Sequence, residues 1–96
     1  MEIAGKRVVI TGGASGIGKA MARRFKAQGA AGIVVADLQA EPLQAVADEV
    51  GGLAVPTNVA SEPEIQALVT AAEVHMGHID IFCSNAGVAM LGDEFV

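Results

Sequence analysis

The sequence predicts an α/β fold built on a parallel β-sheet, and three observations lead to that prediction. Short apolar, β-branched runs alternate with longer segments of helical periodicity along the 96 residues. The alternation has the order β-α-β-α-β-α-β, which is typical of a parallel sheet with right-handed crossover connections. A glycine-rich turn, Thr11–Gly18, joins the first strand to the first helix. We expect four strands in the spatial order 3-2-1-4, with helices on both faces of the sheet.

The individual elements follow from apolar spacing and from the residues that begin and end helices. The β-branched run Val8–Ile10 suits a strand that is covered on both faces. Ser61 and Glu64 have the spacing of a capping box, in which Ser61 bonds the amide of Glu64 and Glu64 reaches back. The predicted strands are Lys6–Ile10, Gly32–Ala36, Leu53–Thr57 and Ile79–Cys83. The predicted helices run from about Gly16 to Gln28, from about Pro42 to Val50, and from the Ser61 cap to Met76.

Composition and charge limit the classes of protein and of partner. Apolar residues make up 52% of the chain and charged residues 18%, so residues 1–96 can bury a core and form one domain at most. The net charge of −5 argues against nucleic acid and anionic membranes as partners, because both bind basic surfaces. Cys83 is the single cysteine, which excludes an internal disulfide and favours a reducing compartment. Since the sequence contains neither a signal-peptide pattern nor a membrane-spanning apolar stretch, we expect a cytoplasmic protein.

The turn Thr11–Gly18 predicts a phosphate-binding site. Glycines let the main chain turn sharply and approach an anion closely, because no Cβ lies in the way. The free amides and the dipole at the start of the following helix attract negative charge. A second glycine-bearing loop, Asn85–Gly87, follows the fourth strand. Both loops are expected at the carboxyl ends of the strands, lining the crevice where the strand order reverses.

Asp37 predicts which nucleotide this crevice binds. It lies 19 positions after Gly18, at the end of the second strand. A carboxylate there accepts hydrogen bonds from both hydroxyls of an adenine ribose and repels the 2′-phosphate of NADP. No arginine follows Asp37 directly, so NAD is the expected cofactor.

These motifs, in this order and at this spacing, resemble the short-chain dehydrogenases/reductases over essentially the whole chain. The family's glycine signature is matched by Thr11-Gly12-x-x-x-Gly16-x-Gly18. Its fourth strand and Asn-Asn-Ala-Gly loop are matched by Gly77–Asp80 and Asn85–Gly87, with Ser84 in place of the first Asn. Asn58-Val59 stands where members usually carry Asp-Val. The resemblance implies a Rossmann-type fold and hydride transfer between NAD(H) and an alcohol or carbonyl substrate.

The resemblance also implies which residues contact the cofactor. The diphosphate would lie against the glycine turn, the adenosine ribose against Asp37, and the adenine against Asn58-Val59. The cofactor-binding residues predicted in this way are Gly12, Ser15, Gly16, Ile17, Gly18, Asp37, Leu38, Asn58, Val59, Asn85, Ala86 and Gly87.

Several short polar residues leave two interpretations open. Thr11, Asp80 and Asn85 could contact the cofactor, or each could tie a loop to a strand end. His75 and His78 flank Gly77, but no third ligand lies near them in the sequence, so no metal site is predicted.

Two other functions compete with the dehydrogenase prediction. Gly13–Ala20 fits the P-loop pattern of nucleotide-triphosphate binders except at Ala20, which has no hydroxyl to bind Mg²⁺. The second competitor is a dinucleotide-binding module without catalysis. In the family that the chain resembles, hydride transfer relies on a Ser and a Tyr-x-x-x-Lys motif downstream of Asn85–Gly87, and this sequence contains no tyrosine.

The missing motif leads to two further expectations, and the resemblance leads to a third. No catalytic residue is predicted, and we expect the chain to be inactive alone. We expect the sheet to be truncated after the fourth strand, which would leave Ile79, Ile81 and Phe82 poorly covered and the fragment prone to self-association. The resemblance implies that the full-length parent is a homo-oligomer.

Overall fold

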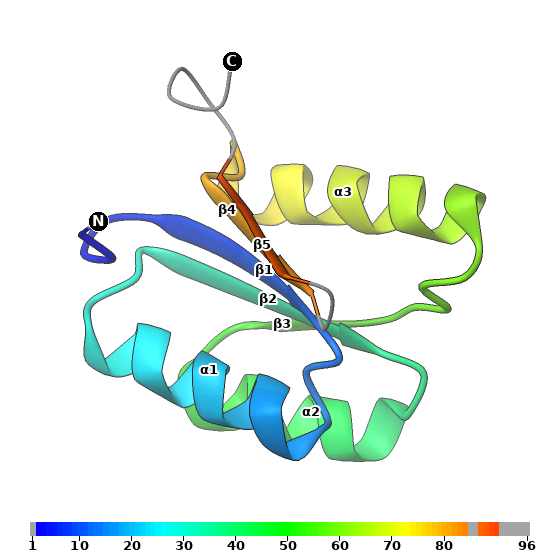
Figure 1. The fold of residues 1–96 in the computed structure, drawn as a ribbon, viewed down its shortest axis with the longest axis horizontal. Helices are drawn as coiled ribbons and strands as arrows, with labels where there is room; N and C mark the ends of the chain where they lie inside the picture. The colour runs from blue at the N-terminus through cyan, green and yellow to red at the C-terminus, as the bar shows by residue number, and fades with distance from the viewer. Residues whose placement is uncertain (1, 85–86, 91–96) are drawn as a thin grey trace.

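The protein folds around one β-sheet with strand order β3-β2-β1-β4-β5, seen in a computed structural model that describes residues 2–84 and the backbone of residues 87–90 (Figure 1). The parallel part, β3-β2-β1-β4, confirms the predicted order 3-2-1-4. The strands are β1 (Arg7–Thr11), β2 (Gly32–Asp37), β3 (Leu53–Pro56), β4 (Ile81–Ser84) and β5 (Gly87–Met90). The helices are α1 (Gly16–Ala27), α2 (Ala40–Val50) and α3 (Glu62–Met76).

Helices cover both faces of the sheet, as expected (Figure 1). Successive residues of a strand point to opposite faces, so Val8 and Ile10 contribute to the core under α1 and α2. Val9 lies between them and contributes to the core under α3. All three are at most 1% exposed, which explains why the strand reads as a continuous apolar run. Among the described helices, none combines the length and the apolar character that crossing a bilayer requires.

The start of α3 differs from the predicted capping box. The Ser61 hydroxyl accepts a hydrogen bond from the Glu64 amide at 3.4 Å, as predicted. The Glu64 carboxylate does not reach back to the Ser61 amide, because that amide already donates to the Asn58 carbonyl at 3.0 Å. Glu64 instead accepts from the Asn58 amide at 2.8 Å. The carboxylate therefore fixes the loop before the helix rather than the cap residue itself.

The prediction that β4 forms an uncovered edge is wrong. The backbone of β5 pairs with β4 in antiparallel register, so β4 has a neighbouring strand on each side. Ile79 and Ile81 are 7% and 2% exposed, and the half-buried Phe82 packs against the core under α3. The expected self-association rested on exposure of these side chains, and the structure removes that reason for it.

Candidate functional site

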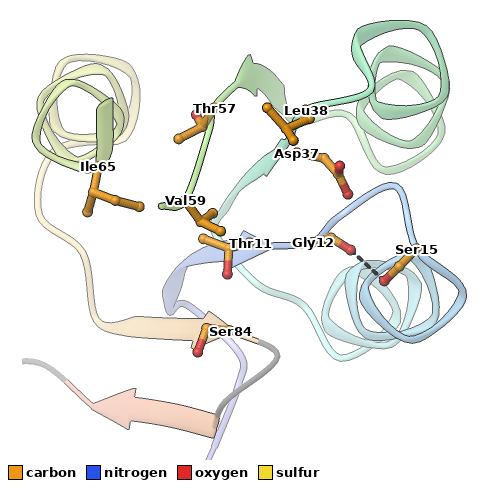
Figure 2. Close-up of a pocket in the computed structure, with 9 residues that line it drawn as sticks. All are labelled: Thr11, Gly12, Ser15, Asp37, Leu38, Thr57, Val59, Ile65 and Ser84. Carbon is orange, nitrogen blue, oxygen red and sulfur yellow. Dashed lines mark hydrogen bonds between the residues drawn. The ribbon is translucent and has the colours of Figure 1, made fainter. Parts of the chain in front are cut away.

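A cavity lies at the carboxyl ends of the parallel strands, where the sequence predicts it. Its volume is about 430 Å³. Figure 2 shows that its lining comes from the ends of β1, β2 and β4, from the turn before α1, and from the loop that leads into α3. The lining residues are Thr11, Gly12, Ser15, Asp37, Leu38, Thr57, Val59, Ile65 and Ser84.

Two glycines bring the start of α1 against the end of β1. Gly12 has a φ of 70°, in the left-handed region that favours glycine. Gly18 lies directly beneath this turn: a Cβ on Gly18 would be 2.0 Å from the Gly12 carbonyl oxygen, so no larger residue fits there. The predicted Gly18 therefore acts in packing, and it does not line the cavity.

The hydrogen bonds of the turn show which amides remain available for a ligand. The Gly13 amide donates to Ala36 O at 3.0 Å, and the Ser15 amide donates to Gly12 O at 3.0 Å. The Ser15 hydroxyl caps the helix by accepting from the Gly18 amide at 3.1 Å. Within the described residues, no acceptor bonds the amides of Gly16 and Ile17, the first two of α1. The first turn of α1 also carries no acidic side chain, so its positive dipole end is not neutralised there.

The Asp37 carboxylate faces the glycine turn. Its Oδ2 accepts a hydrogen bond from the Ala14 amide at 3.1 Å, and its Oδ1 accepts one from the Gln39 amide at 3.4 Å. Figure 2 shows this side chain between Leu38 and the turn that holds Gly12 and Ser15. An acceptor-only group is thus placed at one side of the cavity, bonded to the turn that leads into α1.

Beyond Asp37 the cavity has an apolar mouth. Leu38 and Val59 are 68% and 56% exposed, and both line the cavity. They come from separate loops, after β2 and after β3, and Ile65 from the first turns of α3 lies on the Val59 side (Figure 2). Aliphatic surface of this kind suits contact with a flat, weakly polar ring.

Asn58 lies beside the cavity without lining it. Its Oδ1 accepts from the Ala60 amide at 3.0 Å, and its own amide donates to Glu64. Part of its hydrogen-bonding capacity is therefore used within the loop, and the Nδ2 donors remain for other contacts. These two hydrogen bonds of Asn58 fix the loop that contains Val59.

The remaining predicted residues lie in other places. Gly16 and Ile17 line a separate shallow groove along α1. Gly87 is the first residue of β5 and pairs with Ser84. Asn85 and Ala86 lie outside the described residues.

Sequence reasoning missed four residues of the site: Ala14, Thr57, Ile65 and Ser84. Ile65 has the spacing of a buried helix residue, but it is only half-buried and lines the cavity. Thr57 is buried, and its hydroxyl donates to Val55 O at 2.8 Å. The signal that could have identified Thr57 and Ser84 is their place at the carboxyl ends of β3 and β4, next to the strand-order reversal.

Thr11 ties a strand end, which is one of the two interpretations that the sequence left open. Its hydroxyl donates to the Cys83 carbonyl at 3.3 Å, which ties the end of β1 to β4. Thr11 also lines the cavity.

The P-loop alternative does not fit the geometry. In a P-loop the residues between the first and last glycine form a loop around phosphates. Here α1 already begins at Gly16, so Lys19 lies one turn inside the helix. As for metals, residues 2–84 contain no cluster of three His, Cys, Asp or Glu side chains that could hold an ion.

Comparisons with known proteins agree with this geometry. The family model described as short chain dehydrogenase matches residues 6–95. The (-)-isopiperitenol/(-)-carveol dehydrogenase of Mentha piperita is 37% identical over 91 residues, which are 92% of this chain and 34% of that protein. The structure of 3-ketoacyl-(acyl-carrier-protein) reductase from Brucella melitensis complexed with NADH has a TM-score of 0.80 and 38% identity, covering 83% of this chain and 34% of that one.

A second solved structure gives the same result. A short chain dehydrogenase/reductase from Burkholderia phymatum in complex with NAD has a TM-score of 0.81 and 31% identity, covering 85% of this chain and 31% of that one. The chain thus spans about a third of the length of the relatives it matches. The family model matches nearly the whole chain, and the fold brings Asp37 to the glycine turn as the sequence predicts. The chain therefore belongs to the short-chain dehydrogenase family.

Proposed function

We propose that this chain binds NAD(H) as the cofactor-binding part of a short-chain oxidoreductase. The single observation that carries the proposal is the Asp37 carboxylate, held against the glycine turn by the Ala14 amide at 3.1 Å. This contact supports the proposal because it ties a carboxylate that could accept from a sugar diol to the turn that leads into the start of α1, where a diphosphate would bind.

The diphosphate would bind at the start of α1. The amides of Gly16 and Ile17 have no acceptor within the described residues, and the helix dipole adds a favourable field for an anion. Ser15 would act at the edge of the same site by fixing the turn, since its hydroxyl donates to Gly12 O at 2.7 Å and accepts from the Gly18 amide.

The adenosine ribose would bind Asp37. A carboxylate has about four acceptor positions, and the amides of Ala14 and Gln39 occupy two of them. The two that remain match the two hydroxyl donors of an unmodified ribose. A 2′-phosphate would replace one donor by negative charge next to a carboxylate, which favours NAD over NADP.

The adenine would lie between the exposed side chains of Leu38 and Val59, which frame the mouth of the cavity. Burying these aliphatic groups against a ring removes apolar surface from water. Asn58 would face the edge of the base with its free Nδ2 donors. Asn85, Ala86 and Gly87 would line the cofactor towards its nicotinamide end.

The activity of the whole protein is part of the same proposal. The two solved relatives described above contain NADH and NAD, and the Mentha relative is a dehydrogenase. We propose that the parent transfers a hydride between NAD(H) and an alcohol or carbonyl compound. The 96 residues contain no tyrosine, so the proton transfer that the family performs with Tyr has no candidate group here, and the chain alone is proposed to be inactive.

Calorimetric titration of the purified chain with NADH, NADPH and Mg²⁺–ATP tests the binding proposal. We expect NADH to bind more tightly than NADPH by about tenfold or more, because the 2′-phosphate meets the Asp37 carboxylate. Mg²⁺–ATP is expected to bind more weakly than NADH. Equal affinity for NADH and NADPH, or no heat with either, would contradict the proposal. Formation of NADH from NAD and an alcohol by the 96-residue chain would overturn the proposed inactivity.

A further inference from the structure

The Ala14 amide is bonded differently from its two neighbours in the glycine turn. The amides of Gly13 and Ser15 both donate to backbone carbonyls, those of Ala36 and Gly12. The Ala14 amide donates instead to a side chain, the Asp37 carboxylate, 23 positions further along the chain. The contact is half-buried, so water competes with it only in part. The centre of the turn therefore depends on one side-chain acceptor.

The same carboxylate also bonds the chain after β2. Oδ2 accepts from the Ala14 amide, while Oδ1 accepts from the Gln39 amide at 3.4 Å. Asp37 thus bridges the turn that precedes α1 and the loop that precedes α2. Ala14 directly precedes Ser15, the residue that caps α1 and sets where its first free amides lie.

From these contacts we propose that Asp37 is a positioning residue for the diphosphate site, acting through the Ala14 amide in addition to any contact with the ribose. The inference rests on the proposed binding of NAD(H) and extends it: recognition of the sugar and recognition of the diphosphate are coupled through one carboxylate. When the carboxylate is present, the turn holds Ser15 and the amides of Gly16 and Ile17 in place. Without it, the Ala14 N–H loses its acceptor and the turn loses its link to β2.

The charge of Asp37 allows this role to be separated from ribose binding. The two roles predict different changes in the affinity for a diphosphate ligand when the carboxylate is removed. A carboxylate near a diphosphate repels it. If Asp37 contacted only the ribose, its removal would leave binding of a diphosphate ligand without a ribose diol unchanged or make it tighter. If Asp37 positions the turn, its removal weakens binding of that same ligand.

The test measures the affinities of ADP and of 2′,3′-dideoxy-ADP, which lacks both hydroxyls, for the 96-residue chain and three variants. We expect Asp37→Ala to weaken binding of dideoxy-ADP by about fivefold to tenfold, the effect of losing one charge-assisted hydrogen bond. Asp37→Asn keeps an acceptor oxygen for the Ala14 amide and removes the charge, so it is expected to bind dideoxy-ADP at least as tightly as the original chain. Glu41→Gln, an exposed change of the same charge in the first turn of α2, is expected to leave both affinities unchanged.

Each alternative outcome has a distinct meaning. If the original chain binds both ligands and Asp37→Ala binds dideoxy-ADP equally well or better, the positioning role is overturned while the binding proposal stands. If the original chain binds neither ligand, the binding proposal fails and the positioning role fails with it.

Amide hydrogen exchange in the unsubstituted chain provides a second test, which does not depend on whether a variant folds. The Ala14 amide is expected to exchange at least tenfold more slowly than the amides of Gly16 and Ile17, because only Ala14 donates to an acceptor. Exchange of Ala14 as fast as that of Gly16 and Ile17 would overturn the positioning role.

Discussion

The Asp80 side chain joins the start of β4 to the start of β1. Its Oδ2 accepts a hydrogen bond from the Arg7 amide at 2.8 Å, and the Asp80 amide donates to the Arg7 carbonyl at 2.8 Å. The pair lies at the amino ends of the parallel strands, opposite the cavity. Of the two interpretations that the sequence left open for Asp80, the structure therefore supports the tie between strand ends.

Replacing Asp80 is expected to weaken the fold rather than cofactor binding. Asp80→Ala leaves a half-buried Arg7 amide without its acceptor, and we expect a loss of about 1–3 kcal/mol in the free energy of unfolding. Asp80→Asn keeps an acceptor oxygen and is expected to cost less. Urea denaturation measures both, with His78→Ala as the control, because His78 contacts Asp80 only from an exposed position. An Asp80→Ala variant as stable as the control would contradict this role.

The two glycines at the start of α1 are expected to respond oppositely to alanine. A Cβ on Gly18 would lie 2.0 Å from Gly12 O, so Gly18→Ala forces the turn apart and is expected to destabilise by about 1–3 kcal/mol or more. At Gly16 a Cβ meets nothing within 4 Å, and alanine is expected to stabilise the unliganded chain by up to about 1 kcal/mol. Thermal unfolding without ligand compares them, and equal effects of both substitutions would show that the close approach at Gly18 does not matter.

The Cys83 thiol is expected to be unreactive in the folded chain. It is fully buried on β4, and burial raises its pKa by disfavouring the thiolate. Its contribution to stability is present below the ordinary pKa of a thiol and is lost as the pH rises through the raised value. Labelling with a thiol reagent at mildly alkaline pH is expected to be slow before urea is added and rapid afterwards. Rapid labelling of the native chain would contradict the burial.

The ion pair between Arg23 and Glu49 is expected to make stability depend on pH. The Arg23 guanidinium donates to the Glu49 carboxylate, with Nη2 and Oε1 3.0 Å apart, and this hydrogen bond lowers the pKa of Glu49. A lowered pKa in the folded state gives stability that is present above the unfolded pKa and is lost as the pH falls through the folded value.

A Glu49→Gln variant is therefore expected to be less stable than the original chain at neutral pH and equally stable in strong acid. Because both side chains are exposed, the neutral-pH difference is also expected to shrink in high salt. Urea denaturation at both pH values checks this, and a difference that persists in acid would exclude the ion pair as its cause.

The parts of the fold that the sequence predicts well depend on local patterns. The run Val8–Ile10, the glycine turn and Asp37 lie on consecutive elements, and parallel topology alone brings Asp37 to the turn. The β5 strand was not predicted, because its pairing depends on the open edge of β4 and not on any pattern within Gly87–Met90.

The missed site residues have a similar explanation. Ala14 contacts Asp37 through its backbone amide. Because a backbone contact does not depend on the side chain, the residue type at this position does not indicate it. Ile65 has the spacing of a buried helix residue, and only the position of the loop after β3 places it at the cavity. Glu64 bonds Asn58 instead of Ser61 because the Ser61 amide is already used, a competition that pairwise spacing does not reveal.

Mapping of backbone amide chemical shifts while NADH is added to the 96-residue chain tests the central claim most directly. We predict that the largest changes occur at Gly16 and Ile17, with further changes at Leu38 and Val59, while Val74 on the exposed side of α3 stays unchanged. Shifts that leave the amides of Gly16 and Ile17 unmoved at saturating NADH would contradict the claim that the start of α1 binds the diphosphate of a nicotinamide dinucleotide.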